Sequence, residues 1–395
     1  MSSAHPYRDF WQLDPKIDFL NHGSFGACPT CVLQVQRDFQ NALEREPIHF
    51  LAPERTLEPK LDWVRLAIAN LVHAEPFDIA FVRNATDGVN AVLRSLPLRK
   101  DDEVVVTNHG YNACNNAARY AADQSGAKLR TASIPFPIVD ENEVIEAIQA
   151  ELTDRTRLLL VDHVTSFSGI ILPLAKIVAI AHQRGIRVLV DGAHAPGMIP
   201  VDLTKIGADY YTANHHKWLC GPKASGFLYV RSELQREVRP TVISHAANRA
   251  RPGRSRFIAE FDWNGTYDPS PILALPKAIE FLSSLRPGGL EAHLEANHAL
   301  AIEARSLLTE MLEIEPPAPV SMIGSLITLP LPPGPKLEEG KLDPLQQRLF
   351  DRYQIEVPII CASHRWFRVS CQAYNDIEEY QRLGEALRVE LRHSI

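Results

Sequence analysis

Long apolar runs are missing from this sequence of 395 residues, and so is a strong excess of charge of either sign. No stretch reaches the roughly 18 consecutive apolar residues that a transmembrane helix requires. The opening stretch MSSAHPYRDFWQLDP lacks the apolar core of a secretory signal. A formal net charge of −7 argues against nucleic acid or an anionic membrane as the main partner. The sequence therefore predicts a cytoplasmic globular protein.

Cysteine is also scarce. Six cysteines are spread over the chain, which does not resemble a disulfide framework and fits a reducing compartment. Cys28 and Cys31 form a CxxC pair, but no second pair is spaced to complete a four-ligand zinc site. We therefore predict no metal, and we interpret the pair as two small thiols at the start of a helix.

From about residue 78 the sequence alternates short β-branched runs with helical segments. Predicted strands lie at 78–82, 102–108, 127–136, 156–164, 186–194, 208–214 and 225–231, with helices at 87–96, 112–126, 141–152 and 173–185. Near-continuous apolar strands joined by crossover helices are typical of a buried, mainly parallel sheet with helices on both faces. The short CGPKA link before the last strand allows that strand to pair antiparallel.

A smaller α/β layer is predicted after residue 270. Two helices at 271–285 and 288–312 precede a strand at 325–331, a Pro-rich loop at 332–341, a helix at 343–353, strands at 355–360 and 367–372, and a final helix at 375–392. A chain of this length exceeds the usual size of a single core. We therefore expect a large domain at 18–270 and a small domain formed by 271–395 together with 1–17.

Polar residues follow five of the predicted strands, in the stretches RNATDG, NHGYNA, DHVTSFSG, DGAHAPG and NHHKW. In open α/β sheets, ligands bind beyond the carboxyl ends of the strands. Asp191 ends one apolar strand and Lys217 follows the next. This pair suggests pyridoxal phosphate, because a lysine can hold the cofactor's aldehyde as a Schiff base and an aspartate can keep its pyridine nitrogen protonated. Ala85 and Thr86 would begin a helix whose N-terminus suits an anion. Taken singly, these residues are more often helix caps and a solvated cation.

The motifs FLNHGSFG, VRNATDGVNAVLRSL, DHVTSFSG, VLVDGAHAPG, NHHKWLCGPKASGFLYV, WNGTYDPS and FRVSCQAYN resemble successive signatures of the class V aminotransferase family. The resemblance extends from about residue 18 to 385 and is closest to the isopenicillin N epimerase-like branch. It implies the fold-type I architecture of three layers, with a mainly parallel seven-stranded sheet and a smaller C-terminal α/β domain.

The resemblance also implies roles for individual residues. Lys217 would form the Schiff base and shuttle protons, Asp191 would pair with the pyridine nitrogen, and Tyr111 would stack on the cofactor. The remaining implied contacts are His194 and Thr165 near the phenolic oxygen, Ala85, Thr86, Asn214 and His216 at the phosphate, Gly265 and Thr266 at the phosphate of a neighbouring protomer, Arg368 at the substrate carboxylate, and Asn21 and His22 on the substrate side. This arrangement implies a homodimer with shared active sites and an amino-acid substrate.

The reaction is less well defined than the cofactor. Epimerisation after removal of the Cα proton is the first expectation, and it needs a second acid, for which His22, His216 and Tyr111 are candidates. C–S lyase or desulfurase-like β-elimination, transamination and a non-catalytic regulator are the alternatives. Cys361 stands seven residues before Arg368, which leaves little loop for the mobile thiol of a desulfurase.

Two further features bear on function. The Arg-rich loop at 249–256 is typical of a solvated surface but would also suit a substrate with an additional carboxylate. A nucleotide-binding protein is disfavoured because the chain has neither a GxGxxG nor a GxxxxGK[ST] motif.

Overall fold

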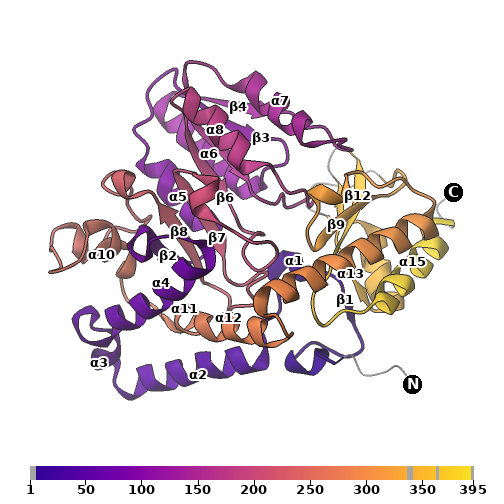
Figure 1. The fold of residues 1–395 in the computed structure, drawn as a ribbon, viewed down its shortest axis with the longest axis horizontal. Coiled ribbons are helices and arrows are strands. Elements are labelled where there is room, and N and C mark those ends of the chain that lie inside the picture. Colours follow the sequence, from indigo (N-terminus) through magenta and orange to yellow (C-terminus); the bar gives the residue numbers. More distant parts are fainter. Residues whose placement is uncertain (1–5, 336–340, 362–363, 393–395) are drawn as a thin grey trace.

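The computed structural model describes residues 6–335, 341–361 and 364–392, so the predicted Pro-rich loop at 332–341 lies partly outside the described residues. In the described chain the main sheet has seven strands in the order β2-β8-β7-β6-β5-β3-β4 (Figure 1). They are β2 (Ile79–Val82), β3 (Glu103–Thr107), β4 (Lys128–Ala132), β5 (Thr156–Asp162), β6 (Arg187–Asp191), β7 (Tyr210–Asn214) and β8 (Gly226–Val230). The pairs from β7 to β4 are parallel, and β8 is antiparallel to β2 and β7. The predicted sheet is confirmed.

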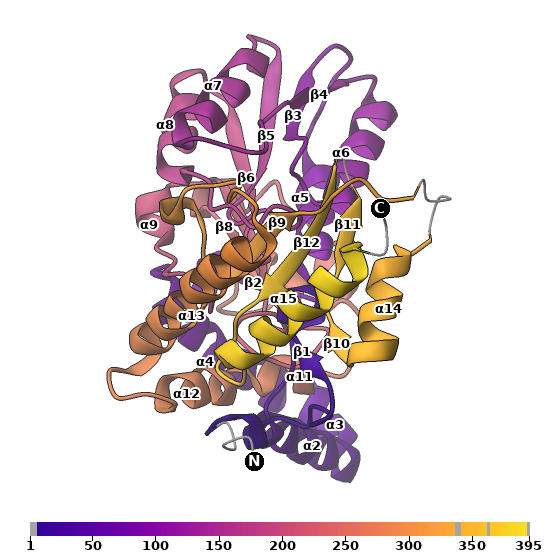
Figure 2. The same ribbon diagram turned by 90° about the vertical axis from the view of Figure 1, so that its right-hand side faces the viewer.

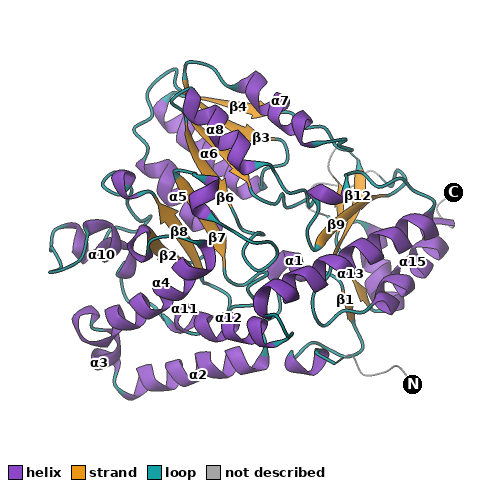
Figure 3. Cartoon of the chain, viewed as in Figure 1, coloured by secondary structure: helices purple, strands orange, loops and turns teal. Residues whose placement is uncertain are grey.

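Helices enclose this sheet on both faces because its strands are apolar on both sides (Figure 3). In β5, Leu158 and Leu160 pack into one cluster with α5 (Ala85–Ser95), α6 (Asn112–Ser125) and α10 (Arg256–Asp262). Leu159 and Val161 point to the opposite cluster. That cluster includes residues of α4 (Glu58–Val72), α7 (Glu141–Glu151), α8 (Leu174–Gln183), α9 (Leu203–Ile206), α11 (Ser270–Leu273) and α12 (Leu275–Ser284).

The N-terminal segment adds helices that the strand pattern did not predict. They are α1 (His22–Phe25), α2 (Thr30–Arg45) and α3 (Pro47–Leu51), followed by α4. Gly26, which follows α1, has φ 69°, and a Cβ there would lie 1.9 Å from the main-chain oxygen of His216. A glycine is therefore needed where this segment packs against the loop of Lys217. Among the described residues, no helix has both the length and the apolar character to cross a membrane.

The C-terminal layer packs α13 (Gly289–Leu312) and α15 (Ile377–Arg392) side by side across strands β9 and β12 (Figures 1 and 2). An antiparallel sheet has the order β11 (Ile359–Cys361), β12 (Arg365–Ser370), β9 (Leu326–Pro330). A separate parallel pair joins β1 (Asp18–Phe19) to β10 (Ile355–Glu356), near α14 (Pro344–Tyr353). The single strand predicted at 355–360 is thus two strands, because Pro358 has no N–H to continue the ladder. The two-domain division remains a prediction.

Candidate active site

A cavity of about 170 Å³ lies at the carboxyl ends of the parallel strands. It is lined by the predicted residues Ala85, Thr86, Tyr111, Asp191, His194, Asn214, His216 and Lys217. Asp162, Asp191 and Asn214 end β5, β6 and β7, and parallel strands end at the same edge of a sheet. This topology brings together residues that are more than 130 positions apart in the sequence, from Ala85 to Lys217.

Lys217 contacts His194, with Nζ 2.8 Å from Nε2. The indole N–H of Trp218 donates to His194 Nδ1 over 3.2 Å, so the neutral imidazole carries its proton on Nε2. Burial first, and then the charge of Lys217, hold the pKa of His194 well below its usual value. Because Nε2–H is a donor, it pairs with the uncharged amine of Lys217. Burial also lowers the pKa of Lys217 to about 8, which favours the nucleophilic form.

Asp191 is 3% exposed and lies beside a second carboxyl group, that of Asp162, with which it is in register across β5 and β6. One oxygen of Asp191 accepts from the Ala193 N–H at 3.0 Å. Burial, and next the charge of Asp191, raise the pKa of Asp162 well above its usual value. Two buried carboxyl groups next to Lys217 make this wall of the cavity suited to binding a protonated nitrogen.

The opposite end of the cavity is built for an anion. The Asn84 side chain caps α5 by accepting from the Asp87 N–H at 2.9 Å, and Asn214 Oδ1 accepts from the Ala85 N–H at 2.9 Å. In the described part of the chain no group accepts a hydrogen bond from the Thr86 N–H. His216 Nδ1 is buried and has no hydrogen-bond partner there. A free amide at a helix N-terminus and an unpaired imidazole nitrogen match a phosphate group.

Tyr111 lies across the cavity from Lys217, whose Nζ is 6.0 Å from the centre of the tyrosine ring. The Tyr111 side chain is 47% exposed. An aromatic ring at this position offers its π-face to a planar group held between it and the lysine. The stacking role that the family resemblance implies for Tyr111 remains a prediction.

Arg368 is buried at the edge of the cavity. It donates to the main-chain oxygen of Ser166, and its Nη2 donates to Ser24 Oγ over 2.9 Å. Ser24 Oγ donates in turn to Asn21 Oδ1 over 2.6 Å. Arg368 Nε is buried without a partner, and burial lowers the pKa of this guanidinium to about 10. A buried cation with an unused donor and no carboxylate partner among the described residues fits an anionic ligand.

Besides Arg368, five predicted residues do not line the cavity, because their polar atoms are used elsewhere or they lie apart: Asn21, His22, Thr165, Gly265 and Thr266. His22 Nδ1 is 2.7 Å from the Tyr374 hydroxyl and its Nε2 is 3.0 Å from the Lys217 main-chain oxygen. Asn21 supports Ser24 rather than facing the cavity. Thr165 Oγ1 pairs with Ser168 Oγ at 2.6 Å within its own turn. Thr266, which follows Gly265, lines a separate cavity.

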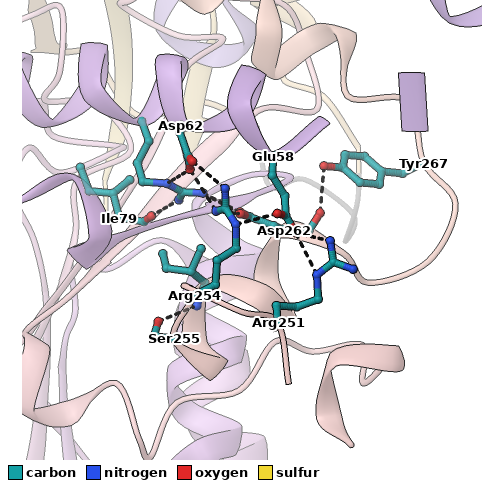
Figure 4. A network of polar contacts seen from close by, with 10 residues as sticks. Glu58, Asp62, Ile79, Arg251, Arg254, Ser255, Asp262 and Tyr267 are labelled. Atoms are coloured by element: carbon teal, nitrogen blue, oxygen red, sulfur yellow. Dashed lines mark hydrogen bonds and ion pairs between the residues drawn. The ribbon is translucent and has the colours of Figure 1, made fainter. Parts of the chain in front are cut away.

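The Arg-rich loop at 249–256 is bound to the chain itself (Figure 4). Arg251 and Arg254 reach Glu58 at 2.7 and 2.8 Å, and Arg254 also reaches Asp62 at 2.6 Å. These pairs attach the loop to α4. Because the two side chains already have carboxylate partners, the interpretation as a recognition site for an additional substrate carboxylate has no support in their geometry.

The sequence model of the family described as aminotransferase class-V matches residues 27–331. The chain therefore belongs to this family of pyridoxal-phosphate-dependent enzymes, and the predicted cofactor is confirmed. Isopenicillin N epimerase of Streptomyces clavuligerus is 34% identical over 393 residues, covering 95% of each chain. A probable L-cysteine desulfhydrase, chloroplastic, of Arabidopsis thaliana is 32% identical, covering 98% of this chain and 86% of the relative.

Solved structures with the same fold include two cysteine-related enzymes. The cystine C–S lyase C-DES, solved with its product cysteine persulfide, has a TM-score of 0.81 at 22% identity, with 94% of this chain and 97% of that chain covered. The cysteine desulfurase CsdA of Escherichia coli has a TM-score of 0.79 at 19% identity, with both chains covered completely. At these identities the likeness shows the fold alone.

The residues of the cavity fit the cofactor. Lys217 would bind its aldehyde, the wall formed by Asp191 would face its ring nitrogen, and the N-terminus of α5 with His216 would hold its phosphate.

The sequence motifs did not single out Asp162, Ser24, Ser166 or Trp218. Asp162 ends a strand in DHVTSFSG, which was a usable signal. The others act through contacts across long sequence separations, which no local pattern reveals.

Proposed function

We propose that this enzyme removes the Cα proton of an L-amino acid with Lys217 and eliminates a sulfur-bearing group from Cβ, as a C–S lyase does. The observation that carries the proposal is the base at the centre of the cavity, the Lys217 amine of lowered pKa next to a neutral His194. Elimination needs one base and a leaving group, so this arrangement is sufficient for it.

Each residue has a defined task in this reaction. Arg368 binds the α-carboxylate with its free donor, and Ser24 and Ser166 hold the guanidinium in place. Pyridoxal phosphate, when bound, withdraws electrons from Cα. Asp191 maintains the positive charge that this withdrawal requires. Lys217 takes the Cα proton in its neutral form, and His194, positioned by Trp218, favours that form and orients the amine.

Epimerisation is the second candidate, and the position of Tyr111 favours it. The tyrosine lies on the side of the cavity opposite Lys217, where a proton would have to be returned. His22 is unsuited to this role, since both ring nitrogens are bonded within the protein and burial lowers its pKa to about 3. His216 is assigned to the phosphate, so the Tyr111 hydroxyl is the second acid to test.

A desulfurase mechanism through Cys361 has less support. Cys361 ends strand β11, and its Sγ lies 3.7 Å from Asp343 Oδ2. Burial, followed by the charge of Asp343, raises the pKa of this thiol and disfavours the thiolate that would attack sulfur. We expect Cys361→Ser to leave sulfur release unchanged. A loss of most of the activity in that variant would support the desulfurase instead.

The deciding experiment incubates the enzyme with L-cysteine, L-cystine, cysteine S-conjugates and sulfur-free amino acids in D2O. Pyruvate, ammonia and a released sulfur species in equal amounts support the lyase. Deuterium at Cα with inversion, and no pyruvate, supports the epimerase, and consumption of an added keto acid supports an aminotransferase. Lys217→Ala should abolish each reaction. Tyr111→Phe should retain elimination with a raised KM but abolish inversion.

The assembly that we propose is a homodimer with shared active sites, working in the cytoplasm. Trp63 and Leu66 on α4 are 54% and 49% exposed, and Ile48 on α3 is 72% exposed, which gives an apolar surface for a second copy. Thr266 would reach the partner's phosphate site. Light scattering should give twice the chain mass, and Thr266→Ala should weaken cofactor binding. A monomer with full cofactor affinity would contradict both statements.

A further inference from the structure

Cys114 lies directly behind the aspartate of the cofactor site. It stands near the start of α6, is 2% exposed, and its Sγ donates to Asp191 Oδ2 over 3.1 Å. The other carboxylate oxygen accepts the Ala193 N–H at 3.0 Å. Each oxygen of Asp191 thus has one donor on the protein side, and its remaining lone pairs face the cavity that the residue lines.

The thiol is present as S–H, because burial and then the charge of Asp191 raise the pKa of Cys114 well above its usual value. It does not line the cavity, so it is not a nucleophile for substrate. Packing alone accounts for a buried cysteine, but not for an S–H directed at a buried carboxylate. A hydrogen bond donated to a carboxylate stabilises its anion and restricts its rotation.

We propose that Cys114 is a positioning residue: its thiol holds the Asp191 carboxylate turned toward the place of the cofactor's ring nitrogen. The proposal rests on pyridoxal phosphate being the cofactor, and it adds a donor from α6 to the site.

The test compares Cys114→Ala with the conservative Cys114→Ser, which keeps a donor. Cys371→Ala is the matched control, since Cys371 is equally buried in the C-terminal core. Cofactor-free proteins are titrated with pyridoxal phosphate, and the visible absorption and circular dichroism of the bound cofactor are recorded against pH. We expect Cys114→Ala to weaken cofactor binding on the order of tenfold, as the loss of one hydrogen bond to a charged group predicts. Its spectra should change, whereas the serine and control variants keep the wild-type values.

A second measurement does not depend on the cofactor. The infrared S–H stretching band that disappears in Cys114→Ser should lie at lower frequency in the cofactor-free wild type than in Asp191→Ala. An unshifted band, or equal cofactor affinity and spectra in Cys114→Ala and wild type, overturns the proposal. An equal loss in the alanine and serine variants also overturns it, because it indicates packing. A wild-type protein that takes up no cofactor would contradict the proposed function alone, and the infrared band would still decide the contact.

Discussion

Replacing Trp218 by Phe removes the indole N–H that donates to His194 Nδ1 over 3.2 Å. In the wild type this bond places the imidazole proton on Nε2, which therefore meets an uncharged Lys217 amine at 2.8 Å. Without it, the proton can move to Nδ1, and Nε2 becomes an acceptor for the lysine ammonium ion. The variant should therefore stabilise the charged form of Lys217.

The magnitude follows from the pKa of Lys217, which burial lowers from 10.5 to about 8. At pH 7.5 roughly a quarter of this amine is neutral, against about one part in a thousand for an ordinary lysine. A new hydrogen bond to the ammonium contributes about 1.5–3 kcal/mol, and one pKa unit equals about 1.4 kcal/mol. We therefore expect the pKa of Lys217 in Trp218→Phe to rise by about one unit or more.

The assay is the rate at which cofactor-free enzyme captures pyridoxal phosphate, followed by stopped-flow absorbance from pH 6 to 10. The wild-type midpoint should lie near pH 8. Trp218→Phe should move it upward and slow capture at neutral pH about tenfold. Trp366→Phe is the matched control, because Trp366 is 3% exposed and its Nε1 has no partner among the described residues. An unchanged midpoint in Trp218→Phe, or a wild-type midpoint near 10, would refute the reasoning.

Three further predictions concern other parts of the chain. Arg368→Ala should weaken binding of amino-acid substrates by about 2–5 kcal/mol, measured as KM, whereas an amino acid lacking the α-carboxylate should bind equally to both enzymes. Asp262→Ala should lower the free energy of unfolding by about 3–5 kcal/mol, because it removes the buried carboxylate that the fully buried Arg65 contacts at 2.7 Å and leaves the half-buried Asp62 at 3.5 Å; an effect below 1 kcal/mol would contradict this. Burial raises the pKa of Glu379 to about 7 from 4.5. The folded state therefore binds this proton more tightly, and stability should fall as pH rises from 4.5 to about 7; in Glu379→Gln this decline of about 3 kcal/mol should be absent from pH-dependent denaturation curves.

The sheet was predictable because it follows from local patterns, whereas the cofactor residues were implied by the family motifs and remain predictions. Apolar runs such as the one ending at Asp191 predict the strands. The end of each run also locates the loop that follows the strand. The split of 355–360 into two strands was missed although Pro358 was visible, since a proline inside a strand pattern is the signal for a break. The pattern of alternating strands and helices did not predict the N-terminal helices α2 to α4, because they precede the first predicted strand.

By itself the sequence determined the family, the cofactor, and the positions of Lys217, Asp191 and Arg368 in their motifs. The tertiary structure alone decided that His22 turns away from the cavity, that Trp218 sets the tautomer of His194, and that Cys114 donates to Asp191. The physical reason is the range of the interactions. Periodicity and strand ends depend on neighbours in the chain, whereas a hydrogen bond between a helix and a strand end 77 residues apart exists only after the sheet has brought them together.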